Sequence, residues 1–303
     1  MTRAFAPTAT QGWQARLALG FEYDGVRTVL RRGERFGPLC VQRPFYPERD
    51  VCHVYILHPP GGIVGGDRLE VDVRVETDAR ALLTTPASSK VYRSAGPASS
   101  ITQTLNVQTG AMLEWLPQDT ILFGGSRVRA RTEIRLARGA RFSGWEVTAL
   151  GRPHSGDDYV SDVSEVSDVS DKSGASSELD QRTALYVDDE PRLIEHQLWR
   201  TGDPVFDAPW GLAGYRVVAT SYTYPADRDT LQRARGILEA RNAGTACDAA
   251  AGICAATLLE DLLVVRALSD DAVEMRHTLA ALWAGLRKLV MGRAPCPPRI
   301  WAT

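Results

Sequence analysis

A glycine-rich run between two strand-like stretches constrains the fold of this chain more than any other feature. Residues 58–69 read His-Pro-Pro-Gly-Gly-Ile-Val-Gly-Gly-Asp-Arg-Leu, with four glycines and two prolines. Residues 54–57 before the run are apolar, and residues 69–76 after it alternate apolar and charged side chains. This alternation is the period of a strand with one buried face. Glycine is required where φ is positive or where another backbone passes close by, so the run predicts a shaped loop joining two strands.

The setting of this run excludes the two common nucleotide-binding glycine loops. A Walker loop requires Gly-Lys-Ser/Thr and opens a helix, and the dinucleotide-binding fingerprint also opens a helix. The run at residues 58–69 contains no lysine and leads into a strand pattern. We therefore do not expect it to cradle a phosphate in either way.

A short pattern recurs three times in the first half of the chain. It reads apolar, any, apolar, any, any, Asp or Gly, Ala, and its copies at residues 73–79, 105–111 and 134–140 begin 32 and 29 residues apart. Each copy leads into a further apolar stretch. A repeat of about 30 residues made of strand, turn and strand predicts stacked β units; the alternative is chance similarity among hairpins.

Helical periodicity appears only near the C-terminus. Residues 229–241 and 271–291 each place apolar side chains on one helical face, and Gly292 is a typical helix stop. Residues 258–268 between them predict a buried strand, and residues 185–199 predict a hairpin. The fold class expected is mostly β: a single domain over residues 1–303, made of stacked, β-helix-like β-sheet layers with about two α-helices near the C-terminus.

Residues 157–179 differ from the rest of the chain in composition. They are rich in Ser, Asp, Glu and Val, and no aromatic residue follows Tyr159 within them. Such an acidic segment buries too little apolar surface to fold by itself. We expect a disordered acidic Ser-rich insertion rather than a domain linker, because the β pattern continues on both sides.

Composition and net charge limit the partners and the cellular location that can be expected for this chain. The 303-residue chain carries a formal net charge of −2, which favours neither a nucleic acid nor an anionic membrane as partner. No apolar run approaches the roughly 18 residues of a membrane span, and the first ten residues lack the apolar core of a signal peptide. Five cysteines form no Cys-x-x-Cys pair, which is typical of a reducing compartment. We expect a cytoplasmic protein.

Residues suited to a tight metal site or to nucleophilic catalysis are scarce. His53 follows Cys52, and His58 stands five residues further on, without a His-x-His or Cys-x-x-Cys pair. A closed zinc or nickel site is therefore not expected, while a weak site using Asp67, Glu146 or His58 stays open. The alternatives are a loop role for His58 and a solvent-facing role for Glu146 near the end of a strand.

Arginine and aromatic residues stand out at three further places. Lys90, Tyr92 and Arg93 follow the Thr- and Ser-rich residues 84–89, and Arg152 lies in the Gly-Arg-Pro triplet at residues 151–153. The chain closes with Pro-Pro-Arg-Ile-Trp-Ala-Thr, which contains Arg299 and Trp301. Trp and Arg are favoured interface anchors, so this end is either folded back onto the core or an exposed docking segment.

Taken together, these motifs resemble the family of the urease accessory protein UreD, also called UreH. The family pattern is a His-Pro-Pro-Gly-Gly-x-x-Gly-Gly-Asp run, a Leu-Leu-Thr-Thr-Pro run and Lys-x-Tyr-Arg, and all three occur here in this order. The match continues through Gly-Arg-Pro at residues 151–153 to Pro-Arg-Ile-Trp at residues 298–301 and so covers nearly the whole chain. The residues that carry it as structural or interface motifs are His58, Gly61, Gly62, Gly65, Gly66, Lys90, Tyr92, Arg93, Arg152, Arg299 and Trp301.

The resemblance implies a nickel-insertion chaperone rather than an enzyme. Proteins of this family bind urease apoprotein and recruit UreF, which in turn binds the GTPase UreG, so a hetero-oligomer is expected. Nickel would be held transiently, with no permanently bound cofactor. The resemblance also implies an internal passage in which carboxylates hold Ni²⁺ weakly, and on that basis Asp67 and Glu146 are the candidate metal residues. The insertion after residue 153 departs from the family pattern.

Two other hypotheses compete with this one. The first is a β-rich small-molecule enzyme that uses His58, Asp67 and Arg93 around the glycine loop; it requires all three side chains in one deep pocket. The second is a structural β adaptor without a role in metal handling. Replacing Asp67 and Glu146 by Ala and measuring the nickel content of urease would separate this adaptor from a nickel chaperone.

Overall fold

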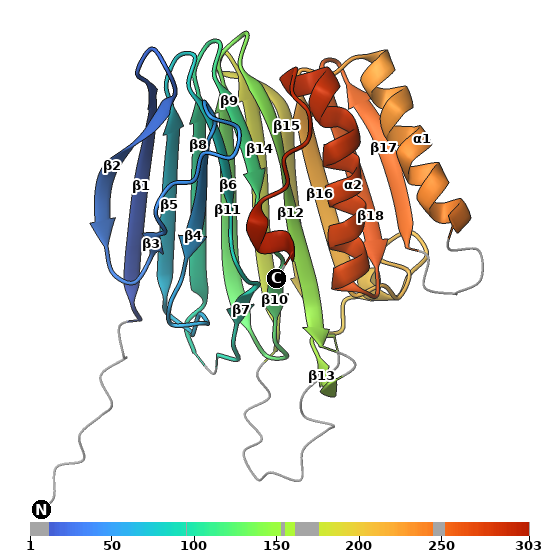
Figure 1. Ribbon diagram of the computed structural model, residues 1–303. Coiled ribbons are helices and arrows are strands. Elements are labelled where there is room, and N and C mark those ends of the chain that lie inside the picture. The colour runs from blue at the N-terminus through green and yellow to red at the C-terminus, as the bar shows by residue number, and fades with distance from the viewer. Residues whose placement is uncertain (1–11, 95, 153–154, 161–175, 245–251, 303) are drawn as a thin grey trace, which may run out of the picture.

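The computed structural model describes residues 12–94, 96–152, 155–160, 176–244 and 252–302, and these residues form two facing sheets with two helices (Figure 1). One sheet, called sheet A, has seven strands. Their order is β15 (Glu190–Arg200), β14 (Glu178–Val187), β11 (Arg127–Leu136), β8 (Ser99–Val107), β5 (Arg68–Val75), β1 (Gln14–Tyr23) and β2 (Thr28–Phe36).

The facing sheet, called sheet B, has eleven strands, eight of them on one continuous path. The path runs β17 (Ile253–Leu259), β18 (Leu262–Ser269), β16 (Val217–Tyr224), β12 (Arg141–Arg152), β9 (Met112–Leu116), β6 (Arg80–Thr84), β4 (Cys52–Leu57) and β3 (Cys40–Val41). Three short strands lie off this path: β7 (Ser89–Val91), β10 (Thr120–Leu122) and β13 (Asp157–Asp158).

The chain passes from sheet A to sheet B and back in successive coils, as the repeat predicts. The strands β5, β8 and β11 pair in parallel in sheet A, and β6, β9 and β12 pair in parallel in sheet B. The register follows the sequence repeat, because Val73 pairs with Leu105 and Leu105 pairs with Ile134. The fold class is thereby confirmed: a single, mostly-β domain of stacked β units.

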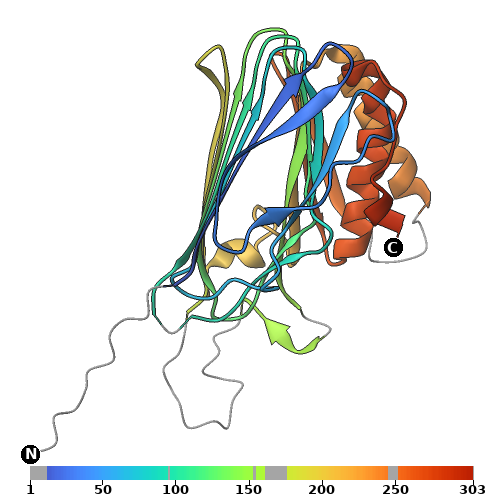
Figure 2. The same ribbon diagram turned by 60° about the vertical axis from the view of Figure 1, so that its left-hand side comes forward.

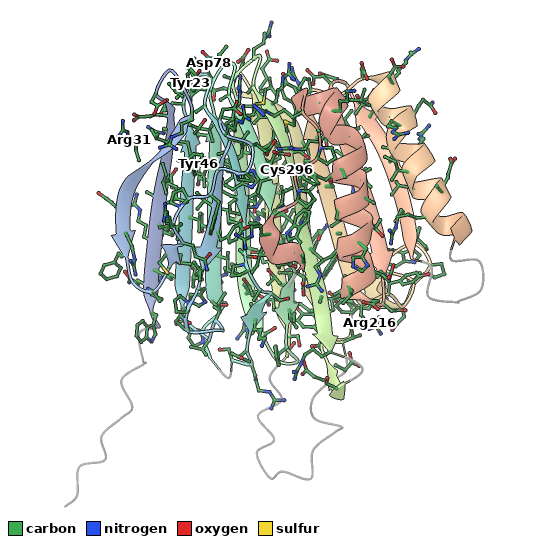
Figure 3. All side chains as sticks on the ribbon, viewed as in Figure 1. Tyr23, Arg31, Tyr46, Asp78, Arg216 and Cys296 are labelled. Atoms are coloured by element: carbon green, nitrogen blue, oxygen red, sulfur yellow. The ribbon has the colours of Figure 1, made fainter. Side chains whose placement is uncertain are left out.

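The turn at the end of each repeat explains why the sixth position of the pattern is Asp or Gly. The residue that is Asp or Gly in the pattern has a positive φ in all three copies: 62° at Asp78, 74° at Gly110 and 82° at Gly139. Left-handed backbone is accessible to Gly and, among other residues, most often to Asn and Asp. Figure 3 places Asp78 at the end of the sheets where the chain crosses over. The alanine that follows each turn is fully buried at Ala79, Ala111 and Ala140.

Both helices lie on the outer face of sheet B, and no described part of the chain forms a helix on the outer face of sheet A (Figure 2). The helix α2 (Ala272–Met291) begins at Asp271, whose carboxylate accepts hydrogen bonds from the amides of Val273 and Glu274 at 2.6 and 3.3 Å. It ends at Gly292, which has a φ of 68°. The helix α1 (Arg228–Gly244) packs against α2 and β17. Both helices predicted from periodicity are confirmed.

Two sequence predictions need correction. The apolar run at residues 258–268 is not one buried strand but parts of β17 and β18, joined by a turn in which Glu260 has a φ of 54°. Two adjacent acidic residues interrupt the run, and the turn forms there. The expected disordered insertion is structured at both ends, since Tyr159 and Ser177 are buried, β13 lies within its limits and β14 begins there at Glu178. Its centre, residues 161–175, lies outside the described residues.

Neither helix in the described part of the chain combines the length and the apolar character that a membrane crossing requires. Short 3₁₀ turns also occur at Pro204–Phe206 and Arg299–Ala302.

Candidate functional site

The glycine-rich run forms a loop that is tied to the next coil of the chain. The Ile63 amide donates to the Lys90 carbonyl at 2.7 Å, and the Tyr92 amide donates to the Ile63 carbonyl at 2.9 Å. The side chain of Ile63 is 1% exposed. The loop therefore behaves as an irregular strand of the coil, with Ile63 as its buried anchor.

Each glycine of the run is required by a specific backbone or packing constraint. Gly61 and Gly66 have φ values of 75° and 91°, which side chains rarely tolerate. A Cβ atom at Gly62 would lie 2.0 Å from the Tyr92 ring, and one at Gly65 would lie 2.1 Å from the Ser94 Oγ atom. The motif residues around position 62 and position 92 are thus in direct contact.

Asp67 has a structural role in this loop. One carboxylate oxygen accepts a hydrogen bond from the Trp13 amide at 2.8 Å, and the other accepts one from the Val64 amide at 2.9 Å. The residue is 5% exposed, and it does not belong to the cavity lining described below. Asp67 thereby fixes the start of β1 to the end of the glycine loop, and the structure does not bring it together with Glu146.

An aromatic stack connects the remaining motifs at this end of the molecule. The rings of Tyr92 and Phe123 lie 4.9 Å apart, and the Arg152 guanidinium lies 4.2 Å above the Phe123 ring. The Arg152 Nε atom also lies 3.6 Å from a carboxylate oxygen of Asp157. Arg93 is exposed and pairs through its backbone with Ser126. Sequence reasoning missed Phe123, whose role depends on its position between two coils.

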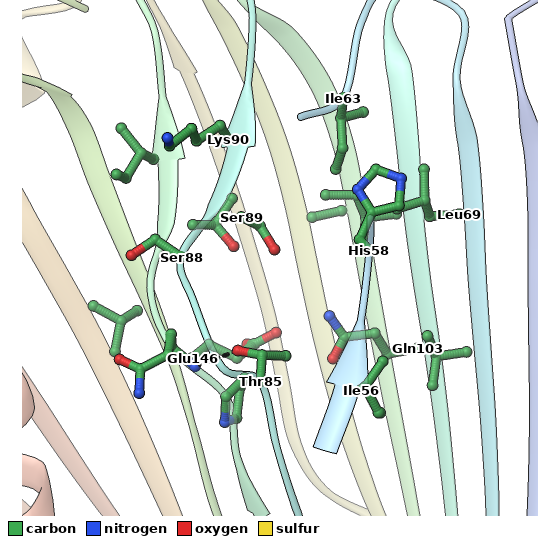
Figure 4. Close-up of a pocket in the computed structure, with 18 of the residues that line it drawn as sticks. Ile56, His58, Ile63, Leu69, Thr85, Ser88, Ser89, Lys90, Gln103 and Glu146 are labelled. Carbon is green, nitrogen blue, oxygen red and sulfur yellow. Dashed lines mark hydrogen bonds between the residues drawn. The ribbon is translucent and has the colours of Figure 1, made fainter. Parts of the chain in front are cut away.

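A cavity of about 520 Å³ lies between the two sheets, and His58, Gly61 and Ile63 of the glycine-rich loop form part of its lining. Figure 4 shows His58 and Lys90 on opposite sides of the cavity, with Glu146 lower in the view beside Thr85. The rest of the lining is mostly apolar, with hydroxyl and amide groups at a few points. Representative lining residues are Ile56, Leu69, Ile101, Gln103, Val128 and Thr148.

Glu146 is the acidic residue that lines this cavity among the described residues. It lies in the middle of β12, not at a strand end, and points inward rather than to solvent. Its carboxylate accepts hydrogen bonds from the Thr132 hydroxyl at 2.6 Å and the Thr183 hydroxyl at 2.7 Å, both from sheet A. The Gln181 amide donates a third at 3.3 Å. Glu146 thus spans the interior from sheet B to sheet A.

Burial controls the ionisation of the cavity groups. It raises the pKa of the Glu146 carboxyl; the three hydrogen bonds oppose this effect, and nearby Glu195 adds to it. Burial lowers the pKa of His58, with a smaller opposing effect from the charge of Asp67. The cavity therefore disfavours charge, and a cation that enters it would compete with a proton for Glu146.

The described residues around the cavity do not form a closed metal site. No cluster of three or more His, Cys, Asp or Glu side chains suited to holding a metal occurs among the described residues. The hypothesis of an enzyme using His58, Asp67 and Arg93 also fails on geometry. Only His58 reaches the cavity, Asp67 binds loop amides, and Arg93 faces solvent.

The C-terminal motif forms part of the packing on sheet B, away from the glycine loop. The Trp301 ring lies 5.9 Å from the ring of Trp145 on β12 and 5.5 Å from the ring of Trp283 on α2. Of the two alternatives for this segment, the anchor folded back onto the core is confirmed for Trp301. Arg299 is exposed beside it.

Comparison with known proteins agrees with this geometry. The family model described as "UreD urease accessory protein" matches residues 14–302. A urease accessory protein UreD of Pseudomonas putida (strain W619) is 43% identical over 292 residues, which is 96% of this chain and 95% of that protein. The corresponding protein of Alkalilimnicola ehrlichii is 42% identical over 308 residues, covering 98% and 95%.

A more distant relative gives the same result. The urease accessory protein UreD of Klebsiella pneumoniae is 38% identical over 300 residues, covering 98% of both chains. These names describe an accessory protein of an enzyme and not a catalyst, which confirms that the chain is not an enzyme. A family-model match over residues 14–302, together with relatives about 40% identical over nearly their full length, places this chain in the UreD family of urease accessory proteins.

Proposed function

We propose that this protein binds urease apoprotein and, together with UreF and with UreG bound through UreF, assists the insertion of nickel into the urease active site. The observation that carries the proposal is the full-length family match. The relatives are named for an accessory role toward urease, and urease maturation requires that its metal be delivered.

Nickel in this proposal is cargo that passes through the cavity between the sheets. Glu146 supplies a carboxylate in an otherwise mostly apolar lining. Oxygen ligands bind borderline divalent metals less tightly than His or Cys. A single carboxylate that also binds two hydroxyl groups can hold Ni²⁺ and release it, whereas a closed set of His and Cys ligands would retain the ion. Asp67 has no part in this step, because its oxygens bind loop amides.

The proposal predicts a complex that can be isolated and a defined effect on urease. Co-expressed with its urease subunits, UreF and UreG, the tagged chain should retain urease apoprotein and UreF on an affinity column. Omitting the chain should leave urease assembled but at least about tenfold poorer in nickel, because delivery depends on the complex. Metal analysis of purified urease measures this. Failure to retain either partner, or full nickel content without the chain, would contradict the proposal.

The structural adaptor is the second candidate. The observation in its favour is that each oxygen of Asp67 and of Glu146 already accepts a hydrogen bond within the chain. An adaptor would retain both partners and activate urease normally after Glu146 is neutralised.

A further inference from the structure

The two sheets end at different strands on the side of the C-terminal helices. Strand β15 lies opposite β16 and β18, because Glu195 accepts a hydrogen bond from the Tyr222 hydroxyl at 3.3 Å and forms an ion pair with Arg266. Sheet B continues one strand further, since β17 pairs with β18 beyond this point (Figure 1). Among the residues that the structure describes, sheet A therefore has no strand opposite β17.

The inner face of β17 is correspondingly uncovered. Ile253 is 52% exposed, and Ala255 and Thr257 on the same face are also exposed. The alternate residue Ala256 is buried in the cluster that includes both helices. Strand β17 is thus packed on its helix side and open on the side that would face the missing strand.

Sheet B extends one strand beyond sheet A here, and we call this offset between the two sheets the step. The backbone of β15 beside the step is free to pair. Within the described residues β15 pairs with β14 alone. The Thr201 amide donates to the Ser177 carbonyl at 3.2 Å, and in an antiparallel ladder hydrogen-bonded pairs alternate with non-bonded ones. Following the register from this pair, the amides and carbonyls of Ile194, His196 and Leu198 point to the free edge.

Both ends of this free edge are closed. Pro191 stands at one end and has no amide to donate. At the other end the Arg200 amide donates to the Asp203 carboxylate at 2.7 Å, and the Asp203 amide donates to the Arg200 carbonyl at 2.9 Å. Proteins commonly shorten or block their sheet edges in this way. The part left open spans residues 194–198, which suits a short partner strand.

Side chains beside the open edge define the chemistry of a partner. On the outer face, Ile194 is 67% and Leu198 is 40% exposed. His196 lies between them, and three basic side chains surround the single carboxylate of Asp180: His196 at 2.9 Å, Arg131 at 2.7 Å and Arg182 at 3.6 Å. This imbalance favours a carboxylate on an incoming strand next to His196, with apolar side chains on either side.

We propose that the free edge of β15 and the uncovered face of β17 form a docking site for an extended strand of urease apoprotein. The strand would add to sheet A, place apolar side chains on Ile253 and Ala255, and place a carboxylate near His196. Main-chain hydrogen bonds would supply affinity and alternate side chains specificity, as in other complexes formed by strand addition. The identity of the partner rests on the proposed function; the shape of the site does not.

A second copy of this chain fits the step poorly. If two copies joined their β15 edges about a two-fold axis, neighbouring strands would be about 4.8 Å apart. Each copy extends β17 and α1 past its own β15, so the two extensions would meet in the same volume (Figure 1). A strand from a different protein meets no such obstacle.

Two substitutions test the site from its two walls, and one serves as a control. His196→Pro removes an amide of the free edge and leaves the backbone hydrogen bonds to β14 in place, although it also removes the side-chain contact with Asp180 on β14. Ile253→Lys places a charge on the uncovered face. Leu289→Lys is the control, because it changes a residue on α2, away from this site, whose exposure of 55% is similar to the 52% of Ile253. Thermal unfolding of each variant checks that the fold is retained.

The measurement is binding of purified urease apoprotein to the full chain, together with hydrogen exchange of the complex. We expect His196→Pro and Ile253→Lys to weaken binding about tenfold or more and Leu289→Lys to leave it unchanged. The amides of residues 194, 196 and 198 should exchange at least about tenfold more slowly in the complex. Ile253→Lys keeps the inference testable if the proline variant does not fold.

Three results would overturn the inference. Unaltered binding by Ile253→Lys together with unaltered exchange along β15 would show that urease docks elsewhere, with the proposed function intact. Self-association of the chain that Ile253→Lys abolishes, with urease binding unchanged, would assign the step to a second copy. If the unaltered chain binds no urease, the proposed function is wrong and with it the partner assigned here.

Discussion

Replacing Arg287 by Met is expected to lower the free energy of unfolding by about 3–5 kcal/mol, the usual effect of breaking a buried ion pair. Arg287 lies on α2 with its side chain fully buried. Its guanidinium binds Glu48, from the loop before β4, at 2.7 and 2.8 Å, and Glu114 on β9 at 2.8 and 2.9 Å. The Ala294 carbonyl accepts a further hydrogen bond.

This arrangement satisfies all five N–H groups of Arg287 and fastens α2 to sheet B. The Trp283 indole donates to Glu114 at 2.6 Å, and a ring nitrogen of His53 lies 2.9 Å from Glu48. Without the guanidinium, Glu48 and Glu114 would lose the cation that lies between them, and Glu114 would keep only the hydrogen bond from the Trp283 indole. Desolvation of such carboxylates is far more costly than the loss of the hydrogen bonds alone.

Urea unfolding of the variant measures this loss of stability. Two further variants test whether the loss comes from the buried charges. Arg138→Met removes an exposed pair with Asp188 and should cost at most about 1 kcal/mol. Adding Glu48→Gln and Glu114→Gln to Arg287→Met removes the unpaired charges and should restore part of the loss. A single Arg287→Met variant within about 1 kcal/mol of the unaltered protein would contradict this role.

The same cluster sets an acid limit for stability. The hydrogen bonds from His53 and Arg287, together with their charge, lower the pKa of Glu48 to about 2 against the opposing effect of burial. A carboxyl with a lowered pKa in the folded state contributes stability above its unfolded pKa. That contribution is lost as the pH falls toward the folded value. Stability should decline from about pH 4.5 toward pH 2, and less steeply in Arg287→Met.

Gly65→Val is expected to lower the free energy of unfolding by about 3 kcal/mol, at the upper end of the usual cost of overpacking. A Cβ atom at Gly65 would lie 2.1 Å from Ser94 Oγ and 2.8 Å from the Pro97 carbonyl oxygen. Ser94 cannot move aside easily, because it is 6% exposed and its hydroxyl donates to that same carbonyl at 2.8 Å. The glycine loop would have to separate from the coil beside it.

Two other glycines give matched controls. Gly61 has a φ of 75° but no neighbour within 4 Å of an added Cβ, so Gly61→Ala should cost about 1 kcal/mol from backbone strain alone. Gly96 has neither constraint, and Gly96→Ala should change stability by less than about 0.5 kcal/mol. The order of the three variants is the readout. Equal losses at Gly65 and Gly96 would refute the close-packing explanation of the motif.

The stacked β fold was predictable because its signal is local. Each repeat carries its own strand alternation, left-handed turn residue and buried alanine, as at Asp78 and Ala79, and the pairing of the coils follows from the repeat itself. Helix α2 was equally accessible, since Asp271 and Gly292 mark its ends in the sequence. The turn at Glu260 was missed because the apolar residues around it obscured a single pair of acidic residues.

The site was predictable only in part, because its contacts join residues far apart in sequence. The motif around Gly62 indicated a shaped loop, but not that its partner is the ring of Tyr92. Glu146 was found through family resemblance, yet its three hydrogen-bond donors come from β11 and β14 and have no sequence signal. For Asp67 the sequence suggested a metal ligand, but its carboxylate binds backbone amides of the loop. A carboxylate beside glycines fits both roles, so the sequence could not separate them.

Transfer of nickel through Glu146 tests the central claim most directly. The measurement is the amount of radioactive Ni²⁺ that enters urease apoprotein from a purified mixture of this chain, UreF and GTP-bound UreG. We expect Glu146→Gln to keep the fold and the complex but to reduce nickel transfer about tenfold or more. Glu133→Gln, on the outer side of β11, and Asp67→Asn should transfer nickel normally once complex formation is matched.

The dependence of this transfer on pH supplies a second readout. Burial raises the pKa of Glu146, so protons compete with Ni²⁺ for the carboxylate, and transfer by the unaltered chain should rise with pH. The Glu146→Gln variant should lose that part of the dependence. Nickel transfer by Glu146→Gln at the full rate and with the same pH profile would contradict the account and leave the protein as an adaptor.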